Sequence, residues 1–351
     1  MLEIIQTARS KQGKFKDAQI TMSHGAGGKA TQSLIEGLLL PAFVNDGLAP
    51  LGDAGAVEGG GARLAMTTDS FVVSPLRFPG GSIGDLAVNG TVNDLAVSGA
   101  RPLALTLSLI LEEGLDTAIL RQEVAAVAAA AKAAEVDIVS GDTKVVERGL
   151  ADSMYMCTAG VGLVDDRATL STASLRPGDR VLVSGTVGEH GTAIMLARGE
   201  FDLDAMIESD TCSLWPVADA LLEEVGPELR CMRDATRGGV ASALNELARA
   251  SNVAMSVREK DVPISAGVQG ASDILGLDAM YVANEGKLVA FVAPDAAERA
   301  LATLRSLPGC EHAAEIGEVR TTPEGMVLLE TAFGGSRVLD LLVGDPLPRI
   351  C

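Results

Sequence analysis

Four aspartates in this chain have positions that suit metal binding. Asp69 ends the strand-like run "RLAMTTD", Asp142 stands in "SGDTKVV" and Asp234 opens the loop "DATRGG". Side chains at such junctions project into the crevice where open α/β sheets bind ligands, and Mg²⁺ commonly bridges one or two carboxylates to substrate phosphates. Any one such aspartate is more often a cap or turn residue, so only the joint placement counts. The predicted site for magnesium and a triphosphate consists of Asp69, Asp94, Asp142 and Asp234.

The segment "GDLAVNGTVNDLAVSG" surrounds Asp94 and predicts a buried helix with one polar stripe. Asp85, Asn89 and Asn93 are spaced at i, i+4 and i+8, so they share a face, while leucines and valines occupy the others. A buried polar stripe needs partners. Those partners are either a bound ligand or other groups of the protein in an internal hydrogen-bond ladder.

The chain ends in "DPLPRIC", which places a cysteine, Cys351, at the last position. Pro346 and Pro348 forbid a helix and favour an extended arm. Seven peptide steps from Gly344 reach at most about 24 Å, enough for the thiol to move between a buried and an exposed position. We expect Arg349 to favour the thiolate, because a nearby cation lowers the pKa of a thiol. The alternative is a stray cysteine on a frayed end.

Composition limits the possible partners. A formal net charge of −19 repels phosphate backbones and anionic lipid surfaces, so nucleic acid and membranes are excluded as partners and a bound nucleotide would need metal ions. The five cysteines form no C-x-x-C pair and are odd in number, which argues against a disulfide framework. His24, His190 and His312 are dispersed, so no zinc site is indicated. The glycine-rich "HGAGGK" does not have the P-loop pattern.

The order of elements predicts an α/β (α+β) protein of two domains, since 351 residues exceed one ordinary core. Strand and helix patterns alternate on both sides of a composition break at 165–180. We expect a Gly-rich peripheral segment at 1–62, a first domain at 63–165, a second at 176–340 and a flexible tail at 341–351, with the active site between the domains or at a subunit contact. No signal-peptide or membrane-spanning run is present in the sequence, which indicates a cytosolic protein.

Several motifs together resemble the HypE family of hydrogenase-maturation carbamoyl dehydratases. They are "TTDSFVVSPLRFPGGSIGDLAVNGTVNDLAVSGARP", "GDTKVV", "RPGDRVLVSGTVGEHG", "RDATRGGVASALNELA", "ANEGK" and the closing "PRIC". The resemblance spans roughly residues 23–351. This family belongs to an ATP-using superfamily with aminoimidazole ribonucleotide synthetase, selenophosphate synthetase and thiamine-monophosphate kinase. One departure is Ser82, where the family pattern has an acid, which weakens that position as a ligand.

The resemblance implies a PurM-like two-domain architecture, a homodimer with the ATP site near its two-fold contact, and a specific reaction. A carbamoyltransferase, HypF, loads a carbamoyl group onto the terminal thiol. The protein then uses ATP and Mg²⁺ to dehydrate it to a thiocyanate. The cyanide passes to iron on a HypC–HypD complex, for the active site of a [NiFe] hydrogenase.

The resemblance also implies roles for individual residues. The catalytic set is Cys351 as the carrier, Glu285 in "NEGK" as the base, and Lys144 as its electrostatic partner. The expected nucleotide-binding residues are Asp69, Phe71, Asp85, Asn89, Thr91, Asn93, Asp94 and Asp142. Two alternatives remain. One is a small-molecule kinase or synthetase of the selenophosphate synthetase type, although such an enzyme needs a reactive cysteine near the N-terminus and residues 1–60 contain none. The other is a scaffold that only carries a thiol.

Overall fold

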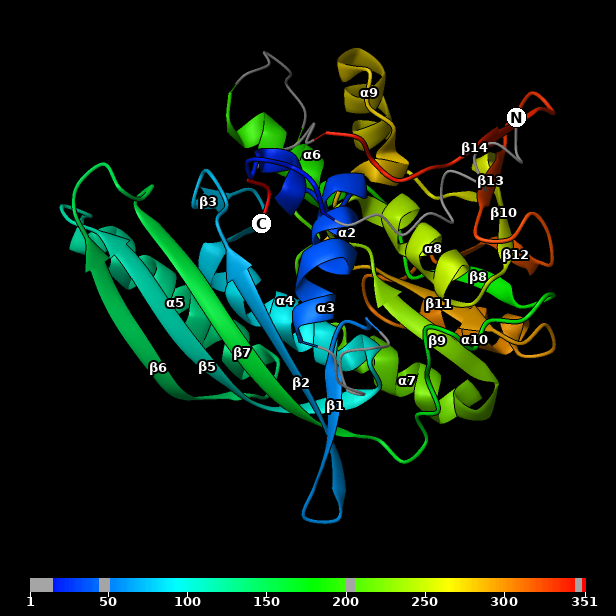
Figure 1. Ribbon diagram of the computed structural model, residues 1–351, viewed down its shortest axis with the longest axis horizontal. Helices are drawn as coiled ribbons and strands as arrows, with labels where there is room; N and C mark the ends of the chain where they lie inside the picture. The colour runs from blue at the N-terminus through cyan, green and yellow to red at the C-terminus, as the bar shows by residue number, and fades with distance from the viewer. Residues whose placement is uncertain (1–14, 44–50, 200–205, 345–348) are drawn as a thin grey trace.

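The computed structural model describes residues 15–43, 51–199, 206–344 and 349–351. Two β-sheets, each covered by helices, account for most of them, and helix α4 lies between the two (Figure 1). This is the mixed α/β two-domain architecture that the sequence predicts. No helix within the described ranges is long and apolar enough to cross a membrane.

The first sheet has five strands in the order β1-β2-β7-β5-β6, and only the β5–β6 pair is parallel. Its strands are β1 (Gly55–Gly59), β2 (Ala62–Phe71), β5 (Ala100–Glu112), β6 (Asp137–Val146) and β7 (Met154–Val164). A short hairpin of β3 (Arg77–Phe78) and β4 (Gly81–Ser82) leads into the first long helix. Along β7, buried and more exposed residues alternate, because one face of the sheet packs on helices and the other does not.

Helices α4 (Ile83–Val97) and α5 (Thr117–Ala133) cover one face of the first sheet. α4 is buried almost all round, as the sequence predicts. Leu86 and Val92 pack with strand residues such as Leu105, whereas Ala96 and Val97 belong to the core of the second sheet. α5 begins after its N-cap residue Asp116, whose carboxylate accepts a hydrogen bond from Ala118 N at 2.8 Å. α4 therefore joins the two halves of the molecule.

The second sheet has seven strands in the order β14-β13-β10-β12-β8-β11-β9, and only β10–β13 is parallel. Its strands are β8 (Arg180–Val183), β9 (Leu229–Asp234), β10 (Ala254–Arg258), β11 (Leu288–Val292), β12 (Ala314–Arg320), β13 (Val327–Glu330) and β14 (Ser336–Val338). Helix α8 (Gly239–Ala250) packs on one face, and α7 (Trp215–Val225) and α10 (Ala297–Arg305) pack on the other. The alternating side chains of β8 show this arrangement, since Val181 and Val183 face α8 and Leu182 faces α7.

The remaining elements surround the area between the sheets. They are η1 (Met22–Gly25), α2 (Lys29–Leu34), η2 (Ile35–Leu39), α3 (Leu40–Ala42), α6 (Glu189–Ala197), η3 (Gly226–Glu228), η4 (Glu259–Asp261), α9 (Ala266–Leu275) and η5 (Ala279–Tyr281). Segment 1–62, expected to be peripheral, includes η1 and α2, which contact the second half: Lys29 N donates to Leu342 O at 3.0 Å, and Arg237 donates to Gly25 O at 2.8 Å. The C-terminus lies close to this N-terminal segment and to β3 (Figure 1).

Candidate active site

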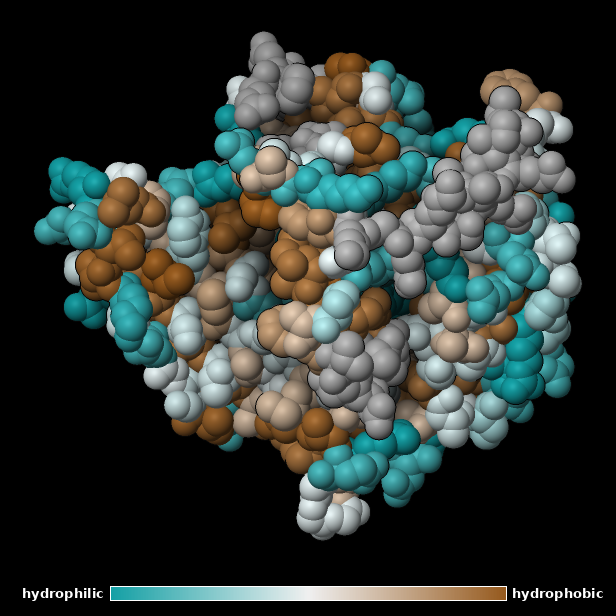
Figure 2. Space-filling model, viewed as in Figure 1, coloured by the Kyte–Doolittle hydropathy of each residue, from teal (hydrophilic) through white to brown (hydrophobic). Residues whose placement is uncertain are grey.

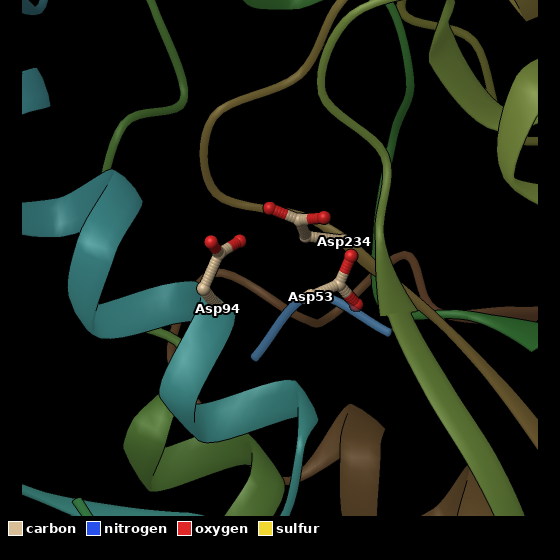
Figure 3. A group of neighbouring side chains, drawn as sticks. All are labelled: Asp53, Asp94 and Asp234. Carbon is tan, nitrogen blue, oxygen red and sulfur yellow. The ribbon is translucent and has the colours of Figure 1, made fainter. Parts of the chain in front are cut away.

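Three carboxylates converge between the two sheets. Asp53, Asp94 and Asp234 each place an oxygen within 4.8 Å of the other two (Figure 3). Asp94 comes from α4, Asp234 from the end of β9, and Asp53 from the loop before β1. Two of the four aspartates predicted to bind metal are therefore together, and Asp53, which the sequence reasoning did not select, completes the group.

Local structure explains how the three side chains meet. The turn after Asp234 is tight because Gly238 has φ +80°, a left-handed conformation that glycine adopts without strain. Asp53 is held by Arg233, whose Nε lies 2.8 Å from its Oδ1. Thr67 Oγ1 contacts both Asp53 O at 3.0 Å and Asp94 Oδ2 at 2.6 Å. β2 and β9 thus fix the cluster from both halves of the chain.

The electrostatics of the cluster favour a cation. Burial raises the pKa of Asp94 and of Asp234 well above 3.8, and repulsion from the neighbouring carboxylates adds to it. The pKa of Asp53 rises to about 6, chiefly through burial and despite the adjacent Arg233. Hard divalent cations prefer such oxygen ligands, and neutralising the mutual repulsion would favour their binding. The donor set therefore fits Mg²⁺.

Asp69 lies beside this cluster, on β2. Its Oδ2 accepts a hydrogen bond from Thr91 Oγ1 at 2.9 Å, and the Thr91 hydroxyl also contacts that of Thr158 at 2.5 Å. Burial raises the pKa of Asp69 although Thr91 and Arg237 act in the opposite direction. Phe71, at the end of the same strand, is buried in the core. Asp69 is thus close enough to the cluster to raise the pKa of Asp94, but it is not one of the three converging ligands.

The end of the chain docks beside Asp69. Val72 N donates to Cys351 O at 3.1 Å and Ser74 N donates to Arg349 O at 3.2 Å, so the last residues pair antiparallel with the chain that follows β2. Ile350 is buried. The predicted flexible tail therefore has an inward, ordered end, whereas Pro346 and Pro348 lie outside the described residues.

Cys351 and Glu285 meet at this point. The Glu285 carboxyl hydrogen bonds the Cys351 thiol, and burial raises the pKa of Cys351 to about 12, with Arg237 as the cation that opposes this rise. Our expectation for Arg349 was wrong for this docked conformation: its guanidinium donates to Val72 O at 3.3 Å and pairs with Asp152. The docked sulfur is therefore a thiol rather than a thiolate at neutral pH.

Glu285 itself is 3% exposed, and its Oε1 has no hydrogen-bond partner among the described residues. Burial raises its pKa well above 4.5, and the negative charges of Asp234 and Asp210 add to the rise. A buried carboxyl with one unused oxygen next to a sulfur can take a proton from a group attached to that sulfur. The role of Glu285 as a base stays a prediction.

A clamp behind Glu285 fixes its position. The Asp210 carboxylate accepts hydrogen bonds from Glu285 N at 3.0 Å and Gly286 N at 3.2 Å, and Lys287 Nζ lies 3.3 Å from it. Asn93 Nδ2 donates to Glu285 O at 3.1 Å. At Gly286 a Cβ would lie 1.8 Å from Asp210 O, so only glycine fits there. The sequence reasoning missed Asp210, which has no recognisable motif around it.

The polar stripe of α4 is used mostly within the protein. Asn89 donates to Thr211 Oγ1 at 3.2 Å, while Asn93 also donates to Cys212 O and accepts from Leu214 N. Asp85 accepts a hydrogen bond from the buried Ser82 Oγ at 2.8 Å, so the serine that departs from the family pattern has a partner within the protein. Of the two kinds of partner considered for the stripe, Asn89 and Asn93 therefore use the internal one: both bond other groups of the protein.

Asp142 and Lys144 lie elsewhere. Both stand on β6, an edge strand, where Lys144 Nζ pairs with Asp142 Oδ2 at 2.6 Å and the side chains are 69% and 61% exposed. Their ladder partners, Ile110 and Ser108, alternate with the leucines that pack under α4 and α5, so the pair is on the opposite face from the carboxylate cluster. Within one chain, neither residue reaches the metal site or Cys351.

A cavity of about 300 Å³ adjoins the docked tail. Its lining includes Gly25, Ala26, Arg237, Gly238 and Cys351. The "HGAGGK" segment and the "TRGG" loop thus face the terminal sulfur together. Arg237 is a further residue that the sequence reasoning missed, and its charge acts on the ionisation of Asp69, Glu285 and Cys351.

Comparison with known proteins agrees with this geometry. Residues 51–164 match the N-terminal domain and residues 176–329 the C-terminal domain of the family described as AIR synthase related protein. The chain is 49% identical to carbamoyl dehydratase HypE of Bradyrhizobium diazoefficiens over 96% of this chain and 97% of that one. Among solved structures, it resembles HypE in complex with ATP (TM-score 0.80, 45% identity, 95% and 100% coverage) and the HypE–HypF complex (TM-score 0.84, 42% identity, 88% and 100% coverage).

Proposed function

This chain belongs to the AIR synthase-related family and, within it, to the carbamoyl dehydratases HypE of hydrogenase maturation. From that premise, we propose that it uses ATP and Mg²⁺ to dehydrate an S-carbamoyl group on its own Cys351 to a thiocyanate, the source of cyanide for the iron of a [NiFe] hydrogenase. One observation carries the proposal. The terminal sulfur is docked against the buried Glu285 carboxyl, beside a carboxylate cluster that suits a magnesium–nucleotide complex.

The reaction needs a leaving group and a base. Converting S–C(=O)–NH₂ to S–C≡N expels the carbonyl oxygen, which leaves readily only after ATP has phosphorylated it. The nitrogen loses one proton when the oxygen is phosphorylated and C=N forms, and the second when phosphate departs and C≡N forms. Glu285 is the group placed to accept these protons, because its buried carboxyl lies beside the sulfur that carries the carbamoyl group and one of its oxygens has no partner among the described residues.

The carboxylate cluster and the surrounding loops hold the nucleotide in this proposal. Asp53, Asp94 and Asp234 would hold Mg²⁺, with Asp69 beside them, and the cavity lined by Gly25, Ala26 and Arg237 receives part of the substrate. Bound Mg²⁺ supplies electrostatic stabilisation of the charge that develops on the transferred phosphoryl group. The negative charge of Asp234 raises the pKa of Glu285, so the protonation state of Glu285 depends on the net charge of the cluster.

We expect the full site to require two subunits. The outer face of the first sheet carries exposed or half-buried apolar residues such as Met66, Val161 and Leu163, and none of the described helices covers it. Figure 2 shows mainly apolar and weakly polar colouring over this face. We infer that pairing of two such faces brings Asp142 and Lys144 of the partner subunit to the site, in the roles that the family resemblance implies.

Ala159→Lys tests this dimer. Ala159 lies on β7, in the middle of the outer face, so a lysine there would place a charge in the contact. The variant is expected to elute as a monomer in size-exclusion chromatography with light scattering and to lose most dehydratase activity. Ala128→Lys, on the exposed side of α5, is the matched control and should remain dimeric. A dimeric, active Ala159→Lys variant would contradict the arrangement.

The tail must also leave its docked position. The proposed partners are HypF, which loads the carbamoyl group, and the HypC–HypD complex, which receives the cyanide. HypF is supported by the solved complex of a relative. A sulfur that pairs with Glu285 inside the protein cannot reach another active site at the same time, so the carrier alternates between inward and outward positions.

Mass analysis of the C-terminal peptide tests the reaction itself. After incubation with a carbamoylating partner and ATP, wild-type protein is expected to show the carbamoyl group on Cys351 and then the loss of one water from it. In Glu285→Gln the carbamoyl group should persist, with dehydration slowed by a factor on the order of 10²–10⁴, the usual contribution of a general base. Glu298→Gln, an exposed carboxylate on α10, should behave as wild type. Water loss at the normal rate in Glu285→Gln would exclude it as the base.

A further inference from the structure

Helix α6 binds the docked end of the tail, residues 349–351, and His190 in its first turn makes the central contact. His190 is fully buried, and its Nε2 lies 2.9 Å from Ile350 O while its Nδ1 lies 2.8 Å from Ser209 Oγ. A carbonyl oxygen only accepts, so Nε2 carries the hydrogen and Nδ1 accepts from the Ser209 hydroxyl. Burial lowers the pKa of His190, which keeps the ring neutral in this tautomer.

The same helix supplies a second donor. Arg198, the C-cap residue of α6, donates from Nη2 to Arg349 O at 2.8 Å and from Nε to Ser74 O at 2.9 Å. Together with the amides of Val72 and Ser74, these side chains bond the main-chain oxygens of the last three residues, Arg349, Ile350 and Cys351. These contacts are made to main-chain atoms and fix the register of the tail without using the Cys351 side chain.

One short turn, Ser209 and Asp210, connects the residues of α6 that bind the tail with the loop that carries Glu285. Ser209 orients the His190 ring, and the adjacent Asp210 accepts hydrogen bonds from the amides of Glu285 and Gly286. Phe78 packs edge-on against the ring, with 5.5 Å between ring centroids. The donor that holds Ile350 and the loop that presents Glu285 are therefore fixed by neighbouring residues, and the Cys351 sulfur is aligned with the carboxyl as a result.

We propose that His190 is a positioning residue for the dehydration reaction: its Nε2–H donates a hydrogen bond to the Ile350 carbonyl oxygen and sets the register in which the Cys351 sulfur faces Glu285. The catalytic part of this inference rests on the function proposed above. The docking part does not, because it concerns only the resting tail. His190 does not touch the reacting atoms, so it acts on the fraction of molecules in which the tail is docked.

His190→Phe and His190→Gln test the proposal as a pair. Phenylalanine keeps a planar ring and removes the donor, whereas the glutamine amide can donate from about the same place as Nε2. Alkylation of Cys351 by iodoacetamide at pH 8, without ATP or partner, is followed by mass spectrometry of the C-terminal peptide. We expect it to be about tenfold faster in His190→Phe than in wild type, as the loss of one buried hydrogen bond implies, and within about twofold of wild type in His190→Gln. Single-turnover dehydration should fall about tenfold in His190→Phe and recover in His190→Gln.

Glutathione added to the same reactions serves as an internal reference, because its free thiol should be alkylated at the same rate alongside every variant. Wild-type alkylation of Cys351 in His190→Phe would overturn the proposal, as would a His190→Gln variant that resembles His190→Phe. If His190→Phe fails to fold, Ser209→Ala replaces it: we expect about threefold faster alkylation, and no change would overturn the proposal. Alkylation of Cys351 needs no carbamoyl group. If Cys351 of the wild-type protein is protected from alkylation but its carbamoyl group never loses water, the proposed function is refuted while the docking of the tail through His190 still holds.

Discussion

Cys351→Ala is expected to form no thiocyanate while binding ATP within about twofold of the wild-type affinity. The loss is complete because the sulfur is the atom that carries the carbamoyl group in the proposed reaction. ATP binding is retained because the tail docks through main-chain atoms, such as Cys351 O with Val72 N, that alanine keeps. The carboxylates of the cluster come from α4, β9 and the loop before β1 and do not depend on the thiol.

Two measurements check this expectation together. Equilibrium dialysis with ATP and Mg²⁺ gives the affinity, and mass analysis of all cysteine-containing peptides after incubation with a carbamoylating partner locates any product. Cys157→Ser is the matched control, since serine preserves the contact with Ser70 and the variant keeps Cys351. Product on another cysteine of Cys351→Ala, or a loss of ATP binding as large as the loss of product, would refute the role of the terminal sulfur.

Much of the fold and part of the site were predictable from the sequence. The buried helix α4 and the alternation of strands and helices were recognised because local periodicity determines them. Asp94 and Asp234 were selected correctly as members of one cluster, since each stands where a strand or a buried helix meets the space between the sheets. The N-terminal helices were not anticipated, because their contacts with Leu342 and Arg237 are far apart in sequence.

The residues that were missed depend on such long-range contacts. Asp53 was placed in a peripheral segment because its surroundings, "GDAGAVEGGGA", have the composition of a loop, and the residues that fix it in the cluster, Thr67 and Arg233, are distant in sequence. Asp210 stands in a stretch without a clear pattern and acts through the amides of Glu285 and Gly286. Asp142 was grouped with the metal ligands because it follows a strand-like motif, but the strand lies at the edge and the side chain points to the outer face. A sequence motif gives residue types and does not specify which subunit or sheet face presents them.

Asp94→Asn should impair catalysis and stabilise the ion-free protein at the same time. In the folded wild type, Asp53, Asp94 and Asp234 have raised pKa values, with that of Asp53 at about 6. The folded state therefore holds protons that the unfolded state has released, and the free energy of unfolding of the ion-free protein falls as the pH rises from about 4 through these folded pKa values. Asparagine removes one carboxylate from the mutual repulsion, so the variant should melt roughly 2–6 °C above wild type at pH 8 in EDTA, and the difference should shrink at pH 5.

The carboxylates that destabilise the ion-free protein are needed for catalysis. With Mg²⁺ and ATP present, wild type should gain melting temperature and Asp94→Asn should gain little, while dehydration falls on the order of a hundredfold or more because a ligand for the metal is gone. Asp142→Asn separates the two effects. Asp142 and its ion-pair partner Lys144 are exposed to solvent, where such a pair contributes little to stability, so the loss of Asp142 should leave ion-free melting nearly unchanged at either pH, even if it slows catalysis at the proposed subunit contact. If Asp94→Asn melted no higher than wild type in EDTA at pH 8 and still responded fully to Mg²⁺, the three converging carboxylates would not be the magnesium site.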